Sequence, residues 1–388
     1  MVKATAVLNS PLRHEVLLPN GRLQVEVDRA DWSLQRLCGF AARHNPRRGF
    51  LFVSKVLGKH WPSAPSEMAA AHETLAARLP GPGPRPALFI GMAETATGLG
   101  QGVFEAYLAQ HGQDSAVYVQ TTRYPLSGAQ TLNFEERHSH AQSLRLHWPE
   151  EAELREAFAN ASMLALVDDE LSTGQTFRSL LAAYRSINPR VQRVCLVSLT
   201  DFMGHEARAQ WRGEAAQVDF ISLLSGAVTF EPDPHFRAEP AAPAQAQVAC
   251  RRDHVGPFSA RLGTAQALRL PGDLLERLNT RLPMDRPVLV LGTGEFMHPA
   301  FCLARGLALQ GRDVRVQSTT RSPILLAADI QQRWTFQDPY GEGIPNYLYN
   351  VKPQGQTVLL CCETPLSRAL ADTVEQLGAE LIRFGVIP

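Results

Sequence analysis

The run LALVDDELSTGQT, residues 164–176, is the most informative part of the sequence. An apolar run ends in two carboxylates, Asp168 and Asp169, and a turn of small polar residues then leads into a helical pattern. A short apolar run bounded by a turn and followed by a helix is typical of a buried strand in an α/β protein. We therefore expect a strand at 163–167 and a helix at 176–186.

The turn of this unit has the chemistry of an anion site. Ser172, Thr173, Gly174, Gln175 and Thr176 supply hydroxyl donors, backbone N–H groups and the positive end of a helix dipole, which together suit a phosphate monoester. The adjacent acids can accept hydrogen bonds from two vicinal hydroxyls. A ribose 5-phosphate fits this spacing, whereas a plain helix cap would leave the paired acids unexplained.

Strands and helices alternate on both sides of this unit, which indicates a parallel α/β sheet. The segment 32–43 predicts an apolar helix, and the histidine-rich segment 134–148 predicts a loop or a mobile hairpin. Further strands are expected at 23–27, 50–57, 87–92, 115–122, 193–199 and 218–224, and further helices at 66–79, 100–110 and 150–160.

The second half of the chain repeats the first. Three landmarks recur in the same order, and one of them shares the pattern TTR-x-P, so an internal duplication is a better interpretation than chance. The pairs are FIGMAE (89–94) with VLGTGE (290–295), VYVQTTRYP (117–125) with VRVQSTTRSP (314–323), and LALVDDE (164–170) with VLLCCE (358–363).

The duplication predicts two tandem Rossmann-like α/β domains. Between the copies, residues 231–249 are rich in Pro and Ala and lack periodicity, which favours a domain connection. We expect a first domain at 1–235, a linker at 236–251 and a divergent copy at 252–388.

Composition excludes several classes of function. The 388 residues carry 38 basic and 38 acidic side chains, so no net field gathers nucleic acid. No apolar run approaches the roughly eighteen residues of a bilayer helix, and no secretory apolar core follows the N-terminus. The six cysteines form no CxxC pair, which argues against a disulfide framework or a thiolate zinc site. We expect a cytoplasmic protein that binds neither nucleic acid nor membranes.

The run 164–176 strongly resembles the fingerprint with which type I phosphoribosyltransferases bind 5-phosphoribosyl 1-pyrophosphate (PRPP). The whole chain is similar to the orotate-phosphoribosyltransferase-like proteins of bacterial tellurium-resistance and stress gene clusters, whose C-terminal domain is named for its Thr-Arg-Ser-Pro. The motifs that carry this resemblance are NPRRGFLFVSKVLGKH, GMAETATGLG, ERHSHA, VDDELSTGQT, IPNYLYNV and the tetrapeptide at Thr320–Pro323.

The resemblance implies a Mg²⁺-dependent glycosyltransferase that moves the 5-phosphoribosyl group of PRPP to a nitrogenous base and releases pyrophosphate. Asp168 and Asp169 would hold the ribose hydroxyls of Mg-PRPP. The sequence leaves open two alternatives, a PRPP-binding regulatory protein without turnover and N-glycosidic bond cleavage in the reverse direction. It does not identify the acceptor base.

The resemblance places the pyrophosphate loop at GMAETATG, residues 91–98. Gly91 would let the backbone approach an anion, and the N–H groups of Ala93 to Thr95 would cradle it. Glu94 would orient the loop or a magnesium ion. The candidate residues of this loop are Gly91, Met92, Ala93, Glu94 and Thr95.

Arg123 follows the next strand, where a basic residue of the family contacts pyrophosphate; a surface arginine before a proline turn is the alternative. The segment 124–147 would close over the site and exclude water. His138 and His140 are catalytic candidates in this flap. A metal site at His-x-His is less economical because no third ligand follows at a readable spacing.

The segment FLFVSKVLGKHWP (50–62) corresponds to a segment of orotate phosphoribosyltransferases that touches base and PRPP. Ser54, Lys55, Lys59 and His60 are therefore candidates for the acceptor end. The alternative is a structural hairpin with two surface lysines.

The C-terminal copy should not bind PRPP, because Cys361-Cys362 replaces the two acids and the phosphate turn is lost. Type I enzymes pair two subunits, so the copy could supply the neighbour within one chain, as an alternative to a homodimer. We expect it to pack as a pseudo-twofold partner that directs Arg321 and Ser322 toward the N-terminal site.

Overall fold

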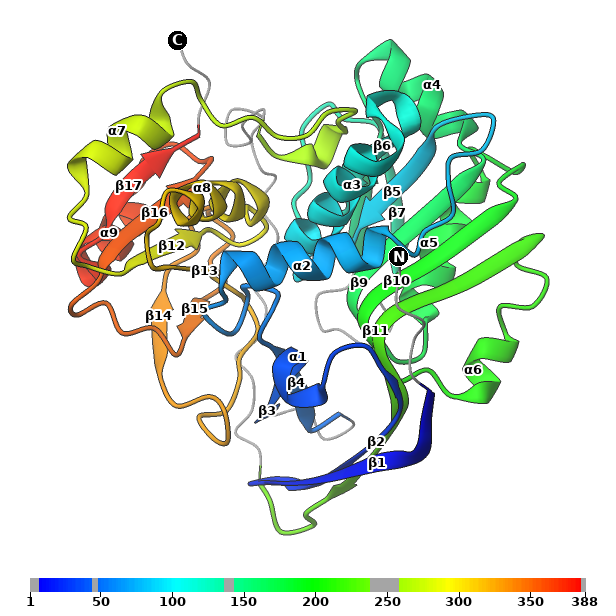
Figure 1. Cartoon of the computed structure of the whole chain (residues 1–388), viewed down its shortest axis with the longest axis horizontal. Helices are drawn as coiled ribbons and strands as arrows, with labels where there is room; N and C mark the ends of the chain where they lie inside the picture. The colour runs from blue at the N-terminus through cyan, green and yellow to red at the C-terminus, as the bar shows by residue number, and fades with distance from the viewer. Residues whose placement is uncertain (1–6, 44–47, 136–142, 238–257, 385–388) are drawn as a thin grey trace.

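The computed structural model describes residues 7–43, 48–135, 143–237 and 258–384, which form two α/β lobes on either side of helix α2, Pro65–Ala76 (Figure 1). The larger lobe holds a seven-stranded sheet. Its strand order is β1 (Val7–Leu18), β2 (Gly21–Ala30), β11 (Gln217–Pro232), β10 (Arg193–Asp201), β9 (Met163–Leu171), β5 (Ala87–Gly91) and β6 (Ala116–Gln120).

Strands β11, β10, β9, β5 and β6 run parallel. Every residue of β5 and β6 is buried, as expected where helices cover both faces of a sheet. The expected parallel α/β fold is confirmed. The helices of this lobe are α1 (Leu34–Leu37), α3 (Thr97–His111), α4 (Ala152–Asn160), α5 (Gln175–Arg185) and α6 (His205–Ala209), together with α2.

The smaller lobe holds a four-stranded parallel sheet. Its strand order is β13 (Val314–Ser318), β12 (Val288–Gly292), β16 (Thr357–Cys362) and β17 (Glu380–Arg383), with helices α7 (Leu274–Arg281), α8 (His298–Leu309) and α9 (Arg368–Leu377). Three antiparallel hairpins complete the structure: β3 (Cys38–Ala42) with β4 (Phe50–Ser54), β7 (Thr131–Glu135) with β8 (Ser143–His147), and β14 (Arg333–Phe336) with β15 (Asn346–Tyr349).

The smaller sheet repeats the strand order of the larger one. The order β6-β5-β9-β10 in the first lobe corresponds to β13-β12-β16-β17 in the second, and in each lobe a hairpin follows the edge strand. The lobes also exchange backbone pairing. Ser63 forms an antiparallel bridge with Val316 of β13, and Thr264 forms one with Tyr118 of β6. These two bridges are reciprocal, as in a pseudo-twofold dimer.

The segment 32–43 differs from expectation. Only Leu34–Leu37 is helical, and Cys38–Ala42 forms β3, which pairs with β4. The cause is a contact with the distant second lobe: the Asp329 carboxylate accepts a hydrogen bond from the backbone N–H of Phe40 at 2.7 Å. A side chain at Gly39 would collide with Asp329, since a Cβ there would lie 2.7 Å from its carboxylate oxygen.

Strand β11 is longer than the expected 218–224. Its continuation pairs antiparallel with β2 after a register shift between Ser225 and Gly226, where the strand must pass the carbonyl oxygen of Glu26 too closely for any Cβ. The segment 134–148 contains the hairpin strand β8, one of the two alternatives expected there. The expected linker lies outside the described residues from residue 238 on.

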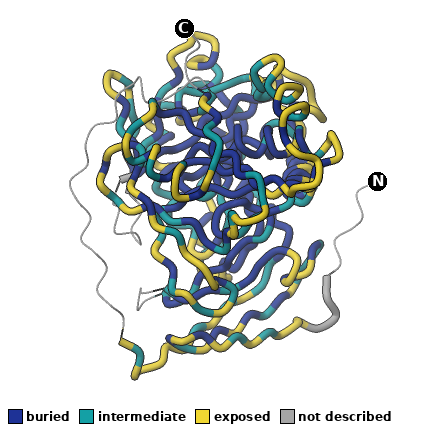
Figure 2. Tube along the Cα trace, turned by 90° about the vertical axis from the view of Figure 1, so that its left-hand side faces the viewer, coloured by how far each residue is buried: buried dark blue, intermediate teal, exposed yellow. Residues whose placement is uncertain are grey.

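Most of both sheets is buried, and the exposed segments lie at the rim of each lobe and along the β1–β2 ribbon (Figure 2). In the part of the chain that the structure describes, no helix has the length and apolar character needed to cross a membrane.

Candidate functional site

The candidate site lies at the carboxyl edge of the larger sheet. Strand β5 connects through α3 to β6 on one side, whereas β9 lies on its other side, so the direction in which successive strands are added to the sheet reverses between β5 and β9. Ligands of open α/β sheets bind outside the strand ends at such a switch point. The segments that meet there are 92–96, 121–123 and 172–174.

Asp168 and Asp169 lie inside the end of β9 rather than beyond it, and Asp168 pairs in register with Ser198 of β10. Both acids are half-buried. The Thr95 hydroxyl donates to Asp169 Oδ1 at 2.9 Å, and the backbone N–H of Asp169 donates to Asp168 Oδ1 at 2.9 Å. The acid pair is therefore joined directly to the loop that follows β5.

The turn after β9 requires glycine at position 174. Gly174 has φ +67° and caps α5, and a Cβ there would lie 2.6 Å from the Met203 methyl carbon and 2.9 Å from Trp211 Nε1. Ser172 and Thr173 are exposed beside the N-terminus of α5. The indole nitrogen of Trp211 is buried beneath this turn and makes no hydrogen bond with the described residues.

Two amides of the loop after β5 are already used, and one of them, that of Ala93, was among the three expected to cradle an anion. The Met92 N–H donates to the Val167 carbonyl at 2.9 Å, and the Ala93 N–H donates to the Thr121 hydroxyl at 2.8 Å. The amides of Glu94 and Thr95 donate no hydrogen bond within the described part of the chain. Thus the N–H groups available to an anion are those of Glu94 and Thr95.

Gly91 serves packing. A Cβ at this position would lie 2.3 Å from the Tyr118 hydroxyl oxygen, which donates to the Thr97 carbonyl at 2.9 Å. Glycine therefore lets the loop after β5 and the start of α3 lie directly against β6.

Glu94 is held by two cations, one from each lobe. Its carboxylate lies 2.7 Å from Lys59 Nζ and 3.2 Å from Arg321 Nε, and the backbone N–H of Arg321 donates to it at 3.3 Å. Burial alone would raise the pKa of Glu94, but Lys59 and Arg321 outweigh burial and lower this pKa to about 2. Glu94 is thus ionised and its charge is compensated.

Lys59 is completely buried, and its ammonium also donates to the Gly294 carbonyl at 2.7 Å, in the loop after β12. Arg321 extends the network to Glu342, 2.5 Å away. The loop after β5 is therefore fixed by side chains and backbone of the second lobe.

The loop after β12 makes the reciprocal contacts. Glu295 accepts hydrogen bonds from the Thr122 hydroxyl at 2.6 Å and from the backbone N–H of Arg123 at 2.8 Å. Its charge is balanced by Arg261, 3.1 Å away, which also pairs with Glu363 at 2.7 Å. Each TTR segment thus offers the backbone N–H of its arginine to the glutamate of the opposite lobe.

Two tyrosines lie between these networks. The rings of Tyr124 and Tyr340 stack at 4.2 Å, and the Arg321 guanidinium carbon lies 5.3 Å from the Tyr124 ring centroid. The Tyr340 hydroxyl donates to Glu363 at 2.7 Å. Tyr124 comes from the first lobe and Tyr340 from the second, so the stacked rings join the two lobes.

The remaining candidates are distributed as follows. Arg123 is half-buried at the site, and its carbonyl accepts from Arg145 at 2.8 Å. Lys55 lies apart from Lys59, because its ammonium donates to the Gln35 carbonyl at 3.0 Å. His60 is buried next to Lys59, and burial lowers its pKa to about 3.

Ser54 and Ser322 are used locally. The Ser54 hydroxyl accepts from the Val56 N–H at 3.3 Å, whereas Ser322 donates its N–H to Thr320 and accepts from the Tyr349 hydroxyl through its carbonyl. His138 and His140 lie outside the described residues.

The reciprocal network includes residues that sequence reasoning missed. Glu295 was present in the repeated VLGTGE and could have been found by aligning it with Glu94. Glu363 likewise ends the repeated VLLCCE, whereas Arg261 and Glu342 stand in no motif and nothing in their local sequence marks them.

Two comparisons decide the family. Residues 37–227 match a family described as phosphoribosyl transferase, and residues 260–378 match the TRSP domain, described as C-terminal to that transferase domain. The chain belongs to this phosphoribosyltransferase family. The two matches together cover most of the chain, and the resemblance to phosphoribosyltransferases with a C-terminal TRSP domain is confirmed.

Solved adenine phosphoribosyltransferases are similar over half of the chain. The enzyme of Thermoanaerobacter pseudethanolicus ATCC 33223 is 20% identical, with 50% of this chain and 97% of that chain covered and a TM-score of 0.34. The Leishmania donovani enzyme is 16% identical, with 50% and 78% covered and a TM-score of 0.33. The Trypanosoma brucei enzyme is 10% identical, with 54% and 86% covered and a TM-score of 0.34. No curated protein matches the chain.

Proposed function

We propose that this phosphoribosyltransferase catalyses Mg²⁺-dependent transfer of the 5-phosphoribosyl group of PRPP to a nitrogenous base. The observation that carries the proposal is the hydrogen bond from Thr95 to Asp169, 2.9 Å long. It joins the acid pair, suited to ribose hydroxyls, to the loop suited to pyrophosphate, at the switch point of the sheet.

Each part of PRPP has a matching group. The exposed Ser172 and Thr173, with the N-terminus of α5 behind Gly174, suit the 5-phosphate. Asp168 and Asp169 accept hydrogen bonds from the ribose hydroxyls. The Glu94 and Thr95 amides, with Arg123 beside them, suit pyrophosphate.

Charge around the reacting carbon favours the displacement. Its transition state resembles an oxocarbenium ion, so the carboxylates of Asp168 and Asp169 stabilise the positive charge that develops on the ribose. Because Lys59 and Arg321 compensate Glu94, this carboxylate does not repel the departing pyrophosphate. Arg321 is accordingly a positioning residue that acts through Glu94.

The acid pair fits magnesium, which prefers carboxylate oxygens together with substrate phosphates. When bound, Mg²⁺ would neutralise the pyrophosphate leaving group. Asp168 and Asp169 are the residues of this chain that would hold Mg-PRPP.

The proposal is tested by a pyrophosphate-release assay with PRPP, Mg²⁺ and purine, pyrimidine and pyridine bases. Base-dependent release from PRPP supports transfer. PRPP binding without release from any base would replace it with a sensor, and formation of PRPP from a nucleotide and pyrophosphate alone would assign the reverse reaction.

The double variant Asp168→Asn/Asp169→Asn tests the acid pair, and Asp273→Asn is its matched control. Each substitution removes a charge-assisted hydrogen bond worth about 1.5 to 3 kcal/mol, so PRPP affinity should fall roughly a hundredfold or more. Asp273→Asn, at an exposed pair with Arg277 in the second lobe, should leave affinity unchanged. Unchanged PRPP affinity in the folded double variant would contradict the assignment.

A further inference from the structure

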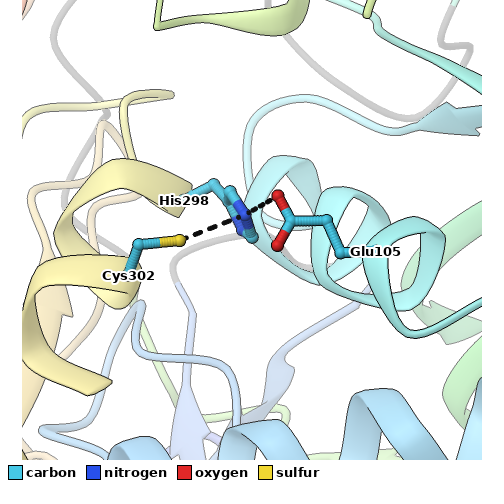
Figure 3. A group of neighbouring side chains, drawn as sticks. All are labelled: Glu105, His298 and Cys302. Carbon is cyan, nitrogen blue, oxygen red and sulfur yellow. Dashed lines mark hydrogen bonds and ion pairs between the residues drawn. The ribbon is translucent and has the colours of Figure 1, made fainter. Parts of the chain in front are cut away.

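A group of three different metal-binding side chains lies between the two lobes, away from the switch point. Glu105 projects from α3 of the first lobe toward His298 and Cys302, which project from α8 of the second (Figure 3). Their ligand atoms all lie within 4.8 Å of one another. His298 and Cys302 are four residues apart, so they share one face of the helix.

One imidazole nitrogen is the centre of this group. His298 Nε2 lies 2.7 Å from Glu105 Oε1 and 3.3 Å from Cys302 Sγ. A single N–H cannot point well at both the oxygen and the sulfur. A cation between the three atoms would accept a lone pair from each of them.

The imidazole of His298 lies inside the protein. His298 is 2% exposed, and its Nδ1 is buried with no hydrogen-bond partner among the residues described. The contacts that define the group are therefore those of Nε2. The backbone N–H of Leu268 donates to Glu105 Oε1 at 2.8 Å and orients the carboxylate.

The duplication shows that this cluster is not required by the fold. At the positions of α3 that correspond to His298 and Cys302, the first lobe has Thr97 and Gln101. The pair is thus specific to α8, and Glu105 meets it from the opposite lobe.

We propose that Glu105, His298 and Cys302 bind one zinc ion that joins α3 to α8. Imidazole nitrogen, thiolate sulfur and carboxylate oxygen are the ligands that zinc takes, and three protein ligands leave a fourth, water-filled position. The ion would connect the two lobes, so metal binding would stabilise their contact. This site is independent of the proposed transfer reaction.

The proposal is tested with the full chain, freed of metal by a chelator and titrated with Zn²⁺ against a competing chromophoric chelator. Co²⁺ is the spectroscopic probe, because a cysteine ligand produces a thiolate-to-cobalt charge-transfer band. We expect one equivalent to bind, the band to appear, and the thermal midpoint to rise with Zn²⁺ concentration.

Cys302→Ser and Glu105→Gln change one ligand each while keeping side-chain size. Zn²⁺ affinity should fall at least about a hundredfold in Cys302→Ser, since loss of outer partners alone costs up to that much. The charge-transfer band should disappear in Cys302→Ser and persist in Cys38→Ser, a cysteine of β3 distant in sequence. Both affinity and band should survive in His138→Asn/His140→Asn, which removes the His-x-His motif.

Three outcomes would overturn the proposal. Equal Zn²⁺ affinity in wild type and Cys302→Ser, absence of the charge-transfer band from wild type, or loss of binding in His138→Asn/His140→Asn would each place the metal elsewhere or nowhere. The three side chains would then form an ion-pair cluster between the lobes.

Discussion

The carboxyl edges of the two sheets differ at the residues proposed to bind PRPP and agree at the residues that join the two lobes. In the first lobe β9 carries the half-buried Asp168 and Asp169 near its end, whereas in the second β16 ends in the fully buried Cys361 and Cys362. Burial raises the pKa of the Cys362 thiol to about 12, so it stays neutral there. The copy has converted a ligand edge into core.

The contacts between the lobes show the opposite trend. Glu94 and Glu295 each accept the backbone N–H of the arginine from the other lobe's TTR segment. Each also has a buried cation from its own lobe, Lys59 or Arg261. The duplicated half has therefore kept what a subunit partner would supply, while losing what the substrate would need.

The largest expected effect comes from restoring acids to the copy. Cys361→Asp/Cys362→Asp would place two carboxylates where neither wild-type side chain is exposed. An uncompensated buried charge costs about 3 to 5 kcal/mol, so the variant should lose more than about 5 kcal/mol of unfolding free energy or fail to fold. Urea denaturation measures the loss.

The matched controls are Cys361→Ser/Cys362→Ser, which should lose much less, and the reverse exchange Asp168→Cys/Asp169→Cys. The latter should remain folded and lose PRPP affinity. A wild-type urea midpoint for Cys361→Asp/Cys362→Asp would show that the two edges do not differ in burial as the structure indicates.

The two interlobe glutamates should differ in what their loss costs. Glu94→Gln leaves the fully buried Lys59 ammonium without its carboxylate, a cost of about 3 to 5 kcal/mol. Glu295→Gln should cost less, because Arg261 keeps Glu363 at 2.7 Å. Urea midpoints compare the stabilities, and the KM for PRPP should rise only in Glu94→Gln, whose loop faces the ligand edge. Equal losses of unfolding free energy in Glu94→Gln and Glu295→Gln would contradict the expected difference between the two glutamates.

The fold was largely predictable because its central strands are continuous apolar runs. β5 and β6 lie at 87–91 and 116–120, within the expected strands 87–92 and 115–122. The prediction of a helix over 32–43 was wrong for Cys38–Ala42. The apolar pattern of this segment fits a helix, but Asp329 and strand β4 hold this part of it as a strand.

The candidate site was also predictable only in part. Its acids and turns lie in one stretch, 164–176, so their spacing could be read directly. The partners of Glu94 come from positions 59 and 321, and only packing of the lobes brings them together. Lys55 and Lys59, neighbours in sequence, have opposite environments that spacing alone could not distinguish.

The two lysines offer the next test. Lys59→Arg keeps the charge but must fit a larger planar group into a site with no exposed surface, which should cost about 2 to 3 kcal/mol. Lys55→Arg is the control. The Lys55 ammonium makes an exposed hydrogen bond to the Gln35 carbonyl and lies over the Trp61 ring, contacts that a guanidinium can also make, so this variant should change stability little. Thermal and urea midpoints of the two variants should therefore separate. Coincident midpoints of the two variants would contradict the complete burial of Lys59.

The smallest expected effect concerns Glu342, which shares Arg321 with Glu94 but lies outside the reciprocal pattern. Burial raises its pKa from 4.5 to about 7, although Arg321 opposes the shift. Because the folded protein holds the proton more tightly than the unfolded chain, this contribution to stability is complete below about pH 4.5 and is lost as pH rises through about 7.

Glu342→Gln should remove that dependence. Between about pH 5 and pH 8, wild type should lose roughly 2 kcal/mol of unfolding free energy that the variant retains, because one pKa unit corresponds to about 1.4 kcal/mol. Urea midpoints across this range measure the difference, and Glu67→Gln, at an exposed pair with Arg36, is the control. Parallel pH profiles for wild type and Glu342→Gln would mean that Glu342 stays ionised beside Arg321. Glu94 and Glu342 would then both be ionised partners of Arg321, and the ion pair with Glu94 would not differ in charge from the pair with Glu342.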